Sequence, residues 1–269
     1  MKLNKGDNMG VIEKIIGIHI EGVYVQNLEK KEKYNLVSSN LIEDEFWNYA
    51  HIIDKNINLK EVWENIKKDL EKINRRPLMY ITSNICDRQL EEQITQGNFE
   101  KLYTDVWMII DDIDSFENYE SKIDFELERA TEKTKDRFVT AVMQGFSGDN
   151  PDDPYEALSD GYRIALEESF GSIDSEYKVI HYLGTYNDED ISTATVVYKD
   201  ENAIIYNVTT NKKYQKNGVC KKMMSEIMKD LSSIGIKVVC VQTEQGFYTE
   251  QVYKKMGFKE IMLGIGYSK

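Results

Sequence analysis

The chain of 269 residues lacks most features of secreted, membrane-bound or metal-binding proteins. Its three cysteines, Cys86, Cys220 and Cys240, are odd in number and show neither CxxC nor metal-ligand spacing, which argues against a disulfide framework. The first residues are polar and lack the apolar segment of a signal peptide. The longest apolar stretches, such as residues 106–110, are too short to span a bilayer. We therefore expect a cytoplasmic protein that holds no metal ion.

Positive charge is also scarce, because 34 Lys and Arg residues stand against 47 Asp and Glu residues, which gives a formal net charge of -13. A surface of this sign repels the phosphate backbone of nucleic acids and anionic lipid headgroups. We therefore expect neither nucleic acid nor a membrane as a partner. A cationic substrate such as an amine would be attracted, although acidic charge also serves solubility alone.

The composition present is that of a globular protein, with 41% hydrophobic and 30% charged residues over a length that suits two domains. Residues 111–120 are acidic and weakly patterned, as linkers are. We expect one domain over residues 1–120 and a second over residues 124–269.

The second half alternates strands and helices. A first strand precedes two helices, and the break between them, residues 147–154, holds two of the three prolines. Short turns predict an antiparallel meander of three strands over residues 177–186, 191–198 and 203–210. A helix closed by Gly235, a strand, a short helix closed by Gly257 and a last strand follow. This order predicts an α+β (mixed α/β) fold with a central mixed sheet flanked by helices.

The first half repeats the end of this order. Its strands and helices are expected, in turn, over residues 46–53, 59–70, 78–82, 88–103 and 106–110, and Gly97 can break the helix over residues 88–103. The shared β, α, β, α, β order is consistent with a duplication, although such alternation is common. The loop over residues 54–58 has no glycine and begins with a carboxylate, so we expect no anion site there. This half should pack against the second and help to shape a substrate cleft.

The most informative segment lies where the strand that ends at Thr210 leads through a polar loop into a helix. Gly218 stands in the first turn of that helix. Helix amino termini offer unpaired backbone N–H groups, and a residue without a side chain lets an anion such as a pyrophosphate approach them. Taken alone, a glycine at this place is more often only a turn residue.

Two motifs give the segment a context. The spacing Gln215-x-x-Gly218-x-Cys220 resembles the Arg/Gln-x-x-Gly-x-Gly/Ala signature of the GNAT superfamily of acyl-CoA-dependent N-acetyltransferases. Residues 252–258, Val-Tyr-Lys-Lys-Met-Gly-Phe, resemble the end of the family's closing helix. The resemblance covers residues 124–269 and implies a GNAT-like sheet there. The first half is then either a degenerate GNAT-like domain or an accessory α/β domain.

The resemblance also implies roles for single residues in the transfer of an acetyl group from acetyl-CoA to an amine. The backbone of Val208 and Thr210 would pair with the pantetheine arm as an added strand does. Tyr253 would act as general acid for the departing thiolate; alternatively, it packs its ring in the core. The residues implied to hold the pyrophosphate are Gln215, Lys216, Asn217, Gly218, Val219 and Cys220.

The sequence departs from the family at two of these positions. Cys220 stands where the family usually has glycine or alanine, and its thiol is either packed or, at a helix amino terminus, reactive. Lys216 stands where glycine is frequent, which changes the loop shape or adds a charge contact. Neither departure removes the helix start.

The sequence does not identify the base that takes the proton of the amine. Glu244 and His181 are candidates, and each has an ordinary alternative as a solvated charge or a core histidine. Three further candidates lie in the loop between the first two helices, namely Asp149, Asp152 and Asp153. The acceptor, an amine-bearing small molecule or peptide, and the oligomeric state, a dimer included, stay open. A second hypothesis is a non-catalytic acyl-CoA-binding or sensing module whose first half binds a protein.

Overall fold

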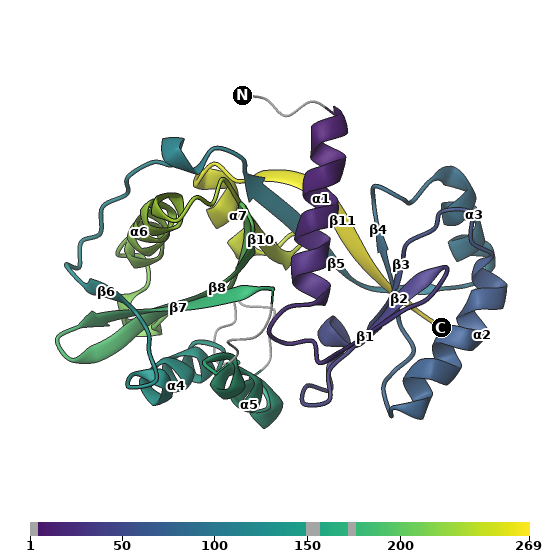
Figure 1. Ribbon diagram of the computed structural model, residues 1–269, viewed down its shortest axis with the longest axis horizontal. Coiled ribbons are helices and arrows are strands. Elements are labelled where there is room, and N and C mark those ends of the chain that lie inside the picture. The colour runs from purple at the N-terminus through teal and green to yellow at the C-terminus, as the bar shows by residue number, and fades with distance from the viewer. Residues whose placement is uncertain (1–4, 149–156, 172–175) are drawn as a thin grey trace.

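The computed structural model describes residues 5–148, 157–171 and 176–269, and shows a single sheet with helices on both faces (Figure 1). The strand order is β1-β2-β3-β4-β11-β5-β10-β9-β8-β7-β6. The strands are β1 (Asn27–Lys30), β2 (Tyr34–Ser38), β3 (Tyr49–Ile52), β4 (Met79–Thr82), β5 (Glu100–Ile110), β6 (Glu126–Arg129), β7 (Lys178–Tyr186), β8 (Glu189–Lys199), β9 (Asn202–Thr210), β10 (Val238–Glu244) and β11 (Lys259–Ser268). The helices are α1 (Lys5–Ile20), α2 (Leu59–Lys72), α3 (Arg88–Gln96), α4 (Lys135–Gly145), α5 (Asp160–Ser169), α6 (Val219–Ser233) and α7 (Tyr248–Lys255), with short 3-10 turns η1 (Glu45–Trp47), η2 (Ile113–Ser115) and η3 (Lys212–Tyr214).

The two halves of the chain contribute interleaved strands to this sheet. Strand β5 of the first half lies between β10 and β11, antiparallel to both, and β11 of the second half lies between β4 and β5. In each half the preceding two strands are parallel, β3 with β4 and β9 with β10. The units β3-α2-β4-α3-β5 and β9-α6-β10-α7-β11 therefore have equivalent arrangements, and the last strand of each is inserted into the other half.

The mixed α/β fold predicted from the sequence is confirmed, with differences in its elements. Helix α3 was expected over residues 88–103 with a possible break at Gly97; it ends at Gln96, directly before that glycine, and β5 begins at Glu100. Gly97 caps the helix, and Asn98 takes a positive φ of 54°, which turns the chain into the strand. Helix α1 and strands β1 and β2 were not predicted.

Side chains of alternating residues of β5 point to opposite faces of the sheet. Val106, Met108 and Ile110 pack in the core cluster under α6. Trp107 and Ile109 pack with Ile12, Ile15 and Ile18 of α1 on the other face. Helices α4 and α5 lie on this second face, over β7 and β8 (Figure 1).

The segment between β5 and β6, predicted as a linker, has no strand but packs closely on α6. Phe116, Tyr119 and Ile123 lie against the core cluster of the second half. The Tyr119 N–H donates to Ser225 Oγ at 2.9 Å, and the Lys122 N–H donates to the carbonyl of Asn217 at 2.9 Å. This segment is therefore part of the wall around the start of α6.

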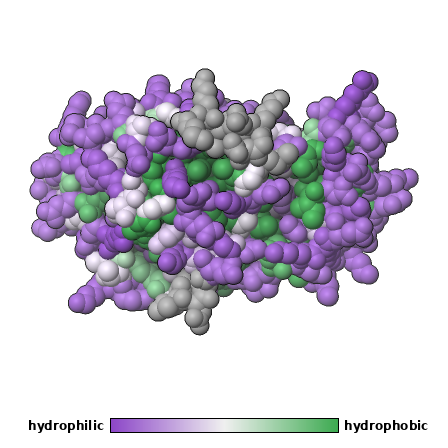
Figure 2. Space-filling view, turned by 45° about the horizontal axis from the view of Figure 1, so that its top comes forward, coloured by the Kyte–Doolittle hydropathy of each residue, from purple (hydrophilic) through white to green (hydrophobic). Residues whose placement is uncertain are grey.

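Hydrophilic residues cover most of the face seen in Figure 2, and hydrophobic residues gather near its middle. Among the helices of the described ranges, none combines the length and the apolar character that crossing a bilayer requires.

Candidate functional site

Strands β9 and β10 separate partway along the sheet. They pair only from Asn202 with Val238 to Ile205 with Val241. From Tyr206 to Thr210, β9 therefore has no strand beside it on this edge, and a register shift with a positive φ of 53° at Asn207 bends it further. Val208 and Thr210, predicted to pair with a pantetheine arm, lie on this open edge.

The turn that follows β9 presents backbone N–H groups in a row. Lys216 and Gly218 have positive φ angles of 62° and 86°, and Gly218 caps α6 without a side chain. Across the described part of the chain, no carbonyl or side chain accepts from the N–H groups of residues 216–221. Successive N–H groups on such a turn form a concave anion-binding arrangement, which the helix dipole strengthens.

The carbonyl oxygens of the same turn are already occupied. Gln215 Nε2 donates to the carbonyl of Thr210 at 3.1 Å, and Asn217 Nδ2 donates to the carbonyl of Gln215 at 3.0 Å. Ser121 Oγ donates to the carbonyl of Asn217 at 3.0 Å. Because these three carbonyls are bonded and, among the described residues, the N–H groups of residues 216–221 are not, the turn favours an anion. The Gln215 and Asn217 side chains hold the turn in shape.

Two residues of the turn have side chains that pack in the core, so only their backbone groups face the turn. Val219 is buried in the core, and Cys220 packs against the same cluster. Burial raises the pKa of the Cys220 thiol to about 11, so the thiol is neutral at physiological pH. The structure therefore favours the packed thiol over the reactive one.

Tyr253 lies on α7 with its ring in the core cluster that also contains Val219. Its side chain is 8% exposed, and its ring meets Phe258 edge-on with 5.5 Å between the centroids. The ring is thus fixed by packing, which suits either of the two roles foreseen for it.

The candidate bases have different environments. Asp149, Asp152 and Asp153 lie outside the described residues. His181 is buried, with its ring nitrogens 2.8 Å from Ser169 Oγ and 3.0 Å from Thr195 Oγ1.

Burial lowers the pKa of His181 to about 3, so this residue is a neutral core histidine. Glu244 ends β10 where the strands have separated, is only partly buried, and has a pKa raised by that burial.

A further carboxyl group, not foreseen from the sequence, lies beside Glu244. Asp105 of β5 is 2% exposed, and its Oδ2 accepts from Tyr80 Oη at 3.1 Å and Gln242 Nε2 at 3.0 Å. Burial, helped by the charge of Glu244 and opposed by these hydrogen bonds, raises the Asp105 pKa to about 8. The sequence signal for Asp105 is a single carboxylate directly before the apolar residues 106–110.

In the equivalent turn of the first half, side chains accept hydrogen bonds from several backbone N–H groups. The Leu59 N–H donates to Gln93 Oε1 at 2.8 Å, and the Glu61 N–H donates to Asn58 Oδ1 at 3.4 Å. Asp54 accepts from the Asn56 N–H at 2.9 Å. That this loop binds no anion stays a prediction. In the part of the chain that the structure describes, no three His, Cys, Asp or Glu side chains gather as metal ligands.

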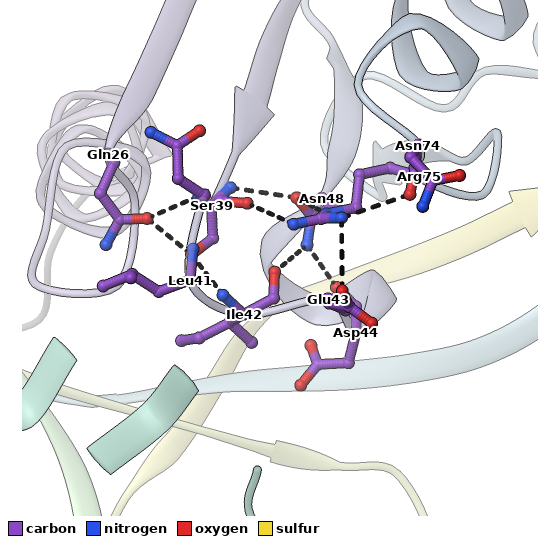
Figure 3. A network of polar contacts seen from close by, with 10 residues as sticks. Gln26, Ser39, Leu41, Ile42, Glu43, Asp44, Asn48, Asn74 and Arg75 are labelled. Carbon is purple, nitrogen blue, oxygen red and sulfur yellow. Dashed lines mark hydrogen bonds and ion pairs between the residues drawn. The ribbon is translucent and has the colours of Figure 1, made fainter. Parts of the chain in front are cut away.

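The loop between β2 and β3 lies in the first half and contacts α5 of the second half. Figure 3 shows the polar contacts that fix the shape of this loop. Arg75 Nε donates to Asn48 Oδ1 at 3.2 Å, and Asn48 Nδ2 donates to the Asp44 carbonyl at 2.7 Å. The loop so fixed meets α5, because Tyr162 Oη donates to Asp44 Oδ2 at 2.5 Å and accepts from Trp47 Nε1 at 2.9 Å. The first half therefore packs against the second, as expected.

Comparisons with known proteins bear on this geometry. Residues 182–264 match the family model of the FR47-like proteins. A GCN5-related N-acetyltransferase from Kribbella flavida superposes with a TM-score of 0.67 at 11% identity, over 96% of this chain and 95% of that one. A second, from Sphaerobacter thermophilus, gives a TM-score of 0.64 at 11% identity, over 90% and 82%.

A tandem GNAT protein from the clavulanic acid biosynthesis pathway gives a TM-score of 0.60 at 8% identity, over 81% of this chain and 74% of that one. No curated protein matches by sequence. The predicted resemblance is thus confirmed at the level of fold, together with an FR47-like domain in the second half.

Proposed function

Because the second half contains an FR47-like, GNAT-related domain, we propose that this protein is an N-acetyltransferase that moves the acetyl group of acetyl-CoA to an amine. The observation that carries the proposal is the turn over residues 216–221. Its N–H groups have no partner among the described residues, and it adjoins the open edge of β9. The pyrophosphate of acetyl-CoA would accept hydrogen bonds from these N–H groups, and the extended pantetheine arm would pair with the adjoining edge of β9.

We assign the residues of the turn by what the geometry allows. Residues 216–221 would hold the pyrophosphate through backbone N–H groups, with the exposed Lys216 side chain adding charge. Val208 and Thr210 would hold the pantetheine arm. A cavity of about 200 Å³ beside them is lined by Gly145, Thr209, Thr210 and Gln215 among others.

In the proposed reaction the amine attacks the thioester carbonyl within one complex. Acetyl-CoA, when bound, supplies an activated acetyl group, and holding both reactants together supplies most of the acceleration. Tyr253, whose phenol keeps its proton at neutral pH in the usual case, would protonate the departing sulfur. In this scheme residues 124–269 are the acetyltransferase domain and residues 1–120 an accessory domain.

The test is calorimetric titration of the full chain with acetyl-CoA. Gly218→Glu would be a poor control, because a Cβ there meets the Glu120 carbonyl oxygen at 2.7 Å and φ is 86°, so folding itself would suffer. Lys216→Glu places a carboxylate at the anion site from an exposed side chain. Lys55→Glu makes the same change in the equivalent loop of the first half, where the side chain is also exposed.

We expect micromolar binding by the unchanged protein, retention by Lys55→Glu and a loss of at least about tenfold in Lys216→Glu. Equal affinity in both variants would contradict the proposed site. The alternative function, acyl-CoA binding without catalysis, is consistent with the second role foreseen for Tyr253, that of a ring packed in the core. Binding without acetyl transfer to any amine in a broad screen would select that alternative.

A further inference from the structure

Asp105 lies where the two halves and the separating strands meet. It is the register partner of Glu244, and Trp107 is that of Gln242, so these side chains share one face of the sheet. Both β10 residues lie beyond the last pair between β9 and β10, Val241 with Ile205. This face carries α1, α4 and α5, opposite to α6. Asp105 and Gln242 therefore lie next to the point where β9 and β10 separate.

The hydrogen bonds of Asp105 leave acceptors free. Both bonds that it receives go to Oδ2, and Oδ1 accepts from none of the described residues. Gln242 Oε1 is fully buried and also has no hydrogen-bond partner in the described ranges. These two oxygens without donors belong to side chains that are hydrogen-bonded to each other, and one of them is on a carboxyl group. Such a pair suits a ligand that donates through several N–H bonds and carries positive charge.

Aromatic side chains lie beside Asp105, and two glycines of β11 leave room for their rings. A Cβ on Gly264 of β11 would lie 1.7 Å from Tyr80 Oη, and a Cβ on Gly266 would lie 2.6 Å from the Tyr103 ring. The glycines thus make room for both rings on this face. Tyr80 Oη accepts from Trp107 Nε1 at 2.8 Å and donates to Asp105. Such support fixes the orientation of a reactive group.

The titratable groups facing Asp105 come from four strands: Tyr49 of β3, Tyr80 of β4, Tyr103 of β5 and Glu244 of β10. Burial raises the pKa of each tyrosine, so all three are neutral at physiological pH. Glu244 is the nearby group that carries charge. Asp105 therefore faces one carboxylate and three neutral phenols, without a cation among the described residues to stabilise its ionised form.

We propose that Asp105, delivered by the strand that the first half inserts into the second, binds the ammonium group of the acceptor and takes its proton. The inference rests on the proposed function and names the substrate class, a primary amine bound as its cation. A bound ammonium group would supply both a positive charge beside the Asp105 carboxylate and hydrogen-bond donors for its Oδ1 and for Gln242 Oε1.

The proton balance of the step is complete. The R–NH₃⁺ group gives one proton to the Asp105 carboxylate, and the nitrogen lone pair attacks the thioester carbonyl carbon. The C–N bond forms and the C–S bond breaks. The sulfur takes the proton held by Tyr253, which regains one from the nitrogen, and Asp105 releases its proton to solvent. The sum is amide, thiol and one proton.

The experiment follows the Asp105 carboxyl resonance in the full chain with ¹³C-labelled aspartate, assigned as the signal lost in Asp105→Asn. The probe is ethylammonium chloride, compared with sodium chloride at equal ionic strength and with ethanol as the uncharged isostere. Without probe the titration midpoint should lie near 8. Ethylammonium should lower it by about one pH unit or more, whereas ethanol and sodium should leave it. A midpoint that ethylammonium leaves unchanged would overturn the proposal.

The same samples separate this inference from the proposed function. Asp105→Asn should keep its affinity for acetyl-CoA but lose about 100-fold or more in acetyl transfer to ethylamine, measured as free CoA thiol. The matched control is Asp69→Asn, since Asp69 also accepts from a tyrosine hydroxyl, that of Tyr34 at 2.6 Å, far from the separated strands. Equal transfer by Asp105→Asn would refute the role of Asp105 alone. Absence of acetyl-CoA binding would refute the proposed function, while the carboxyl titration would still decide the amine site.

Discussion

The turns that lead into α2 and α6 occupy equivalent places in the two halves and differ in how they satisfy their first N–H groups. Before α2, Asn58 and Gln93 supply side-chain acceptors. Before α6, positive φ angles at Lys216 and Gly218 arrange the N–H groups without such acceptors. An anion site of the kind proposed before α6 would therefore depend on a few local side chains and not on the strand-helix arrangement, which both halves share.

The halves differ in a second way, because each completes the sheet of the other. Strand β5 fills the position between β10 and β11, and β11 fills that between β4 and β5. The first half, whose turn is not the proposed anion site, therefore still completes the sheet of the half that carries that site.

Removal of the first half should have the largest effect. A fragment of residues 124–269 lacks β5, so β10 and β11 lose the strand that hydrogen-bonds to both. We expect it not to fold cooperatively, as circular dichroism on heating would show. A fragment of residues 98–269, which keeps β5, should recover part of the transition. Full folding and activity of the shorter fragment would break the comparison, since the second half would then be self-sufficient.

Asp105→Asn should change how stability depends on pH. Burial raises the Asp105 pKa from 3.8 to about 8, so the folded state holds more protons than the unfolded state between these values. The contribution of Asp105 is fully present below about pH 4 and is lost as the pH rises through 8, by at most about 1.4 kcal/mol per pH unit.

The variant should therefore gain stability over the unchanged protein from pH 5 to pH 8 in urea titrations. Asp69→Asn is the control. Although burial opposes it, hydrogen bonds from Lys31 and Tyr34 lower the Asp69 pKa, so this group does not titrate in that range. Parallel stability curves for Asp105→Asn and the unchanged protein would argue against a buried neutral carboxyl group.

Gly218→Ala should cost about 2–3 kcal/mol of unfolding free energy, because it combines an unfavourable φ of 86° with a Cβ 2.7 Å from the Glu120 carbonyl oxygen. Gly235→Ala is matched in φ, at 89°, but has open space around its Cβ and should cost only about 1 kcal/mol. Equal losses of unfolding free energy for the two variants in denaturant titrations would show that the segment over residues 117–124 does not pack closely against Gly218.

Asn58→Ala should have the smallest effect. It removes a side-chain acceptor at the start of α2, and such caps contribute about 1 kcal/mol. The affinity for acetyl-CoA should not change, because this turn is not the proposed site. A gain of a second acetyl-CoA in calorimetry would mean that one side chain is what keeps the first half from binding.

Much of the second half could be predicted because its signals are local. The meander, the helix opened by Gly218 and the closing helix follow from spacing and turn residues. Helix α1 was missed, since its isoleucines and glycines have low helix propensity. Packing of residues such as Ile15 and Ile18 on the sheet stabilises it.

The candidate site was foreseen only where it is a continuous segment. The turn over residues 215–220 can be recognised in the sequence, but the pairing of Asp105 with Glu244 depends on strands far apart in the chain. Likewise, the contact of Glu120 with Gly218 depends on how the segment before β6 crosses α6. Residues brought together by sheet register carry no local signal.

The central claim is that acetyl-CoA binds at the turn before α6 and not at its counterpart before α2. Amide resonances of the full chain, followed by NMR while acetyl-CoA is added, test it most directly. We predict that the amides of residues 216–221 shift strongly while those of residues 55–61 stay in place. Unmoved resonances at residues 216–221, or comparable shifts in both turns, would contradict the account.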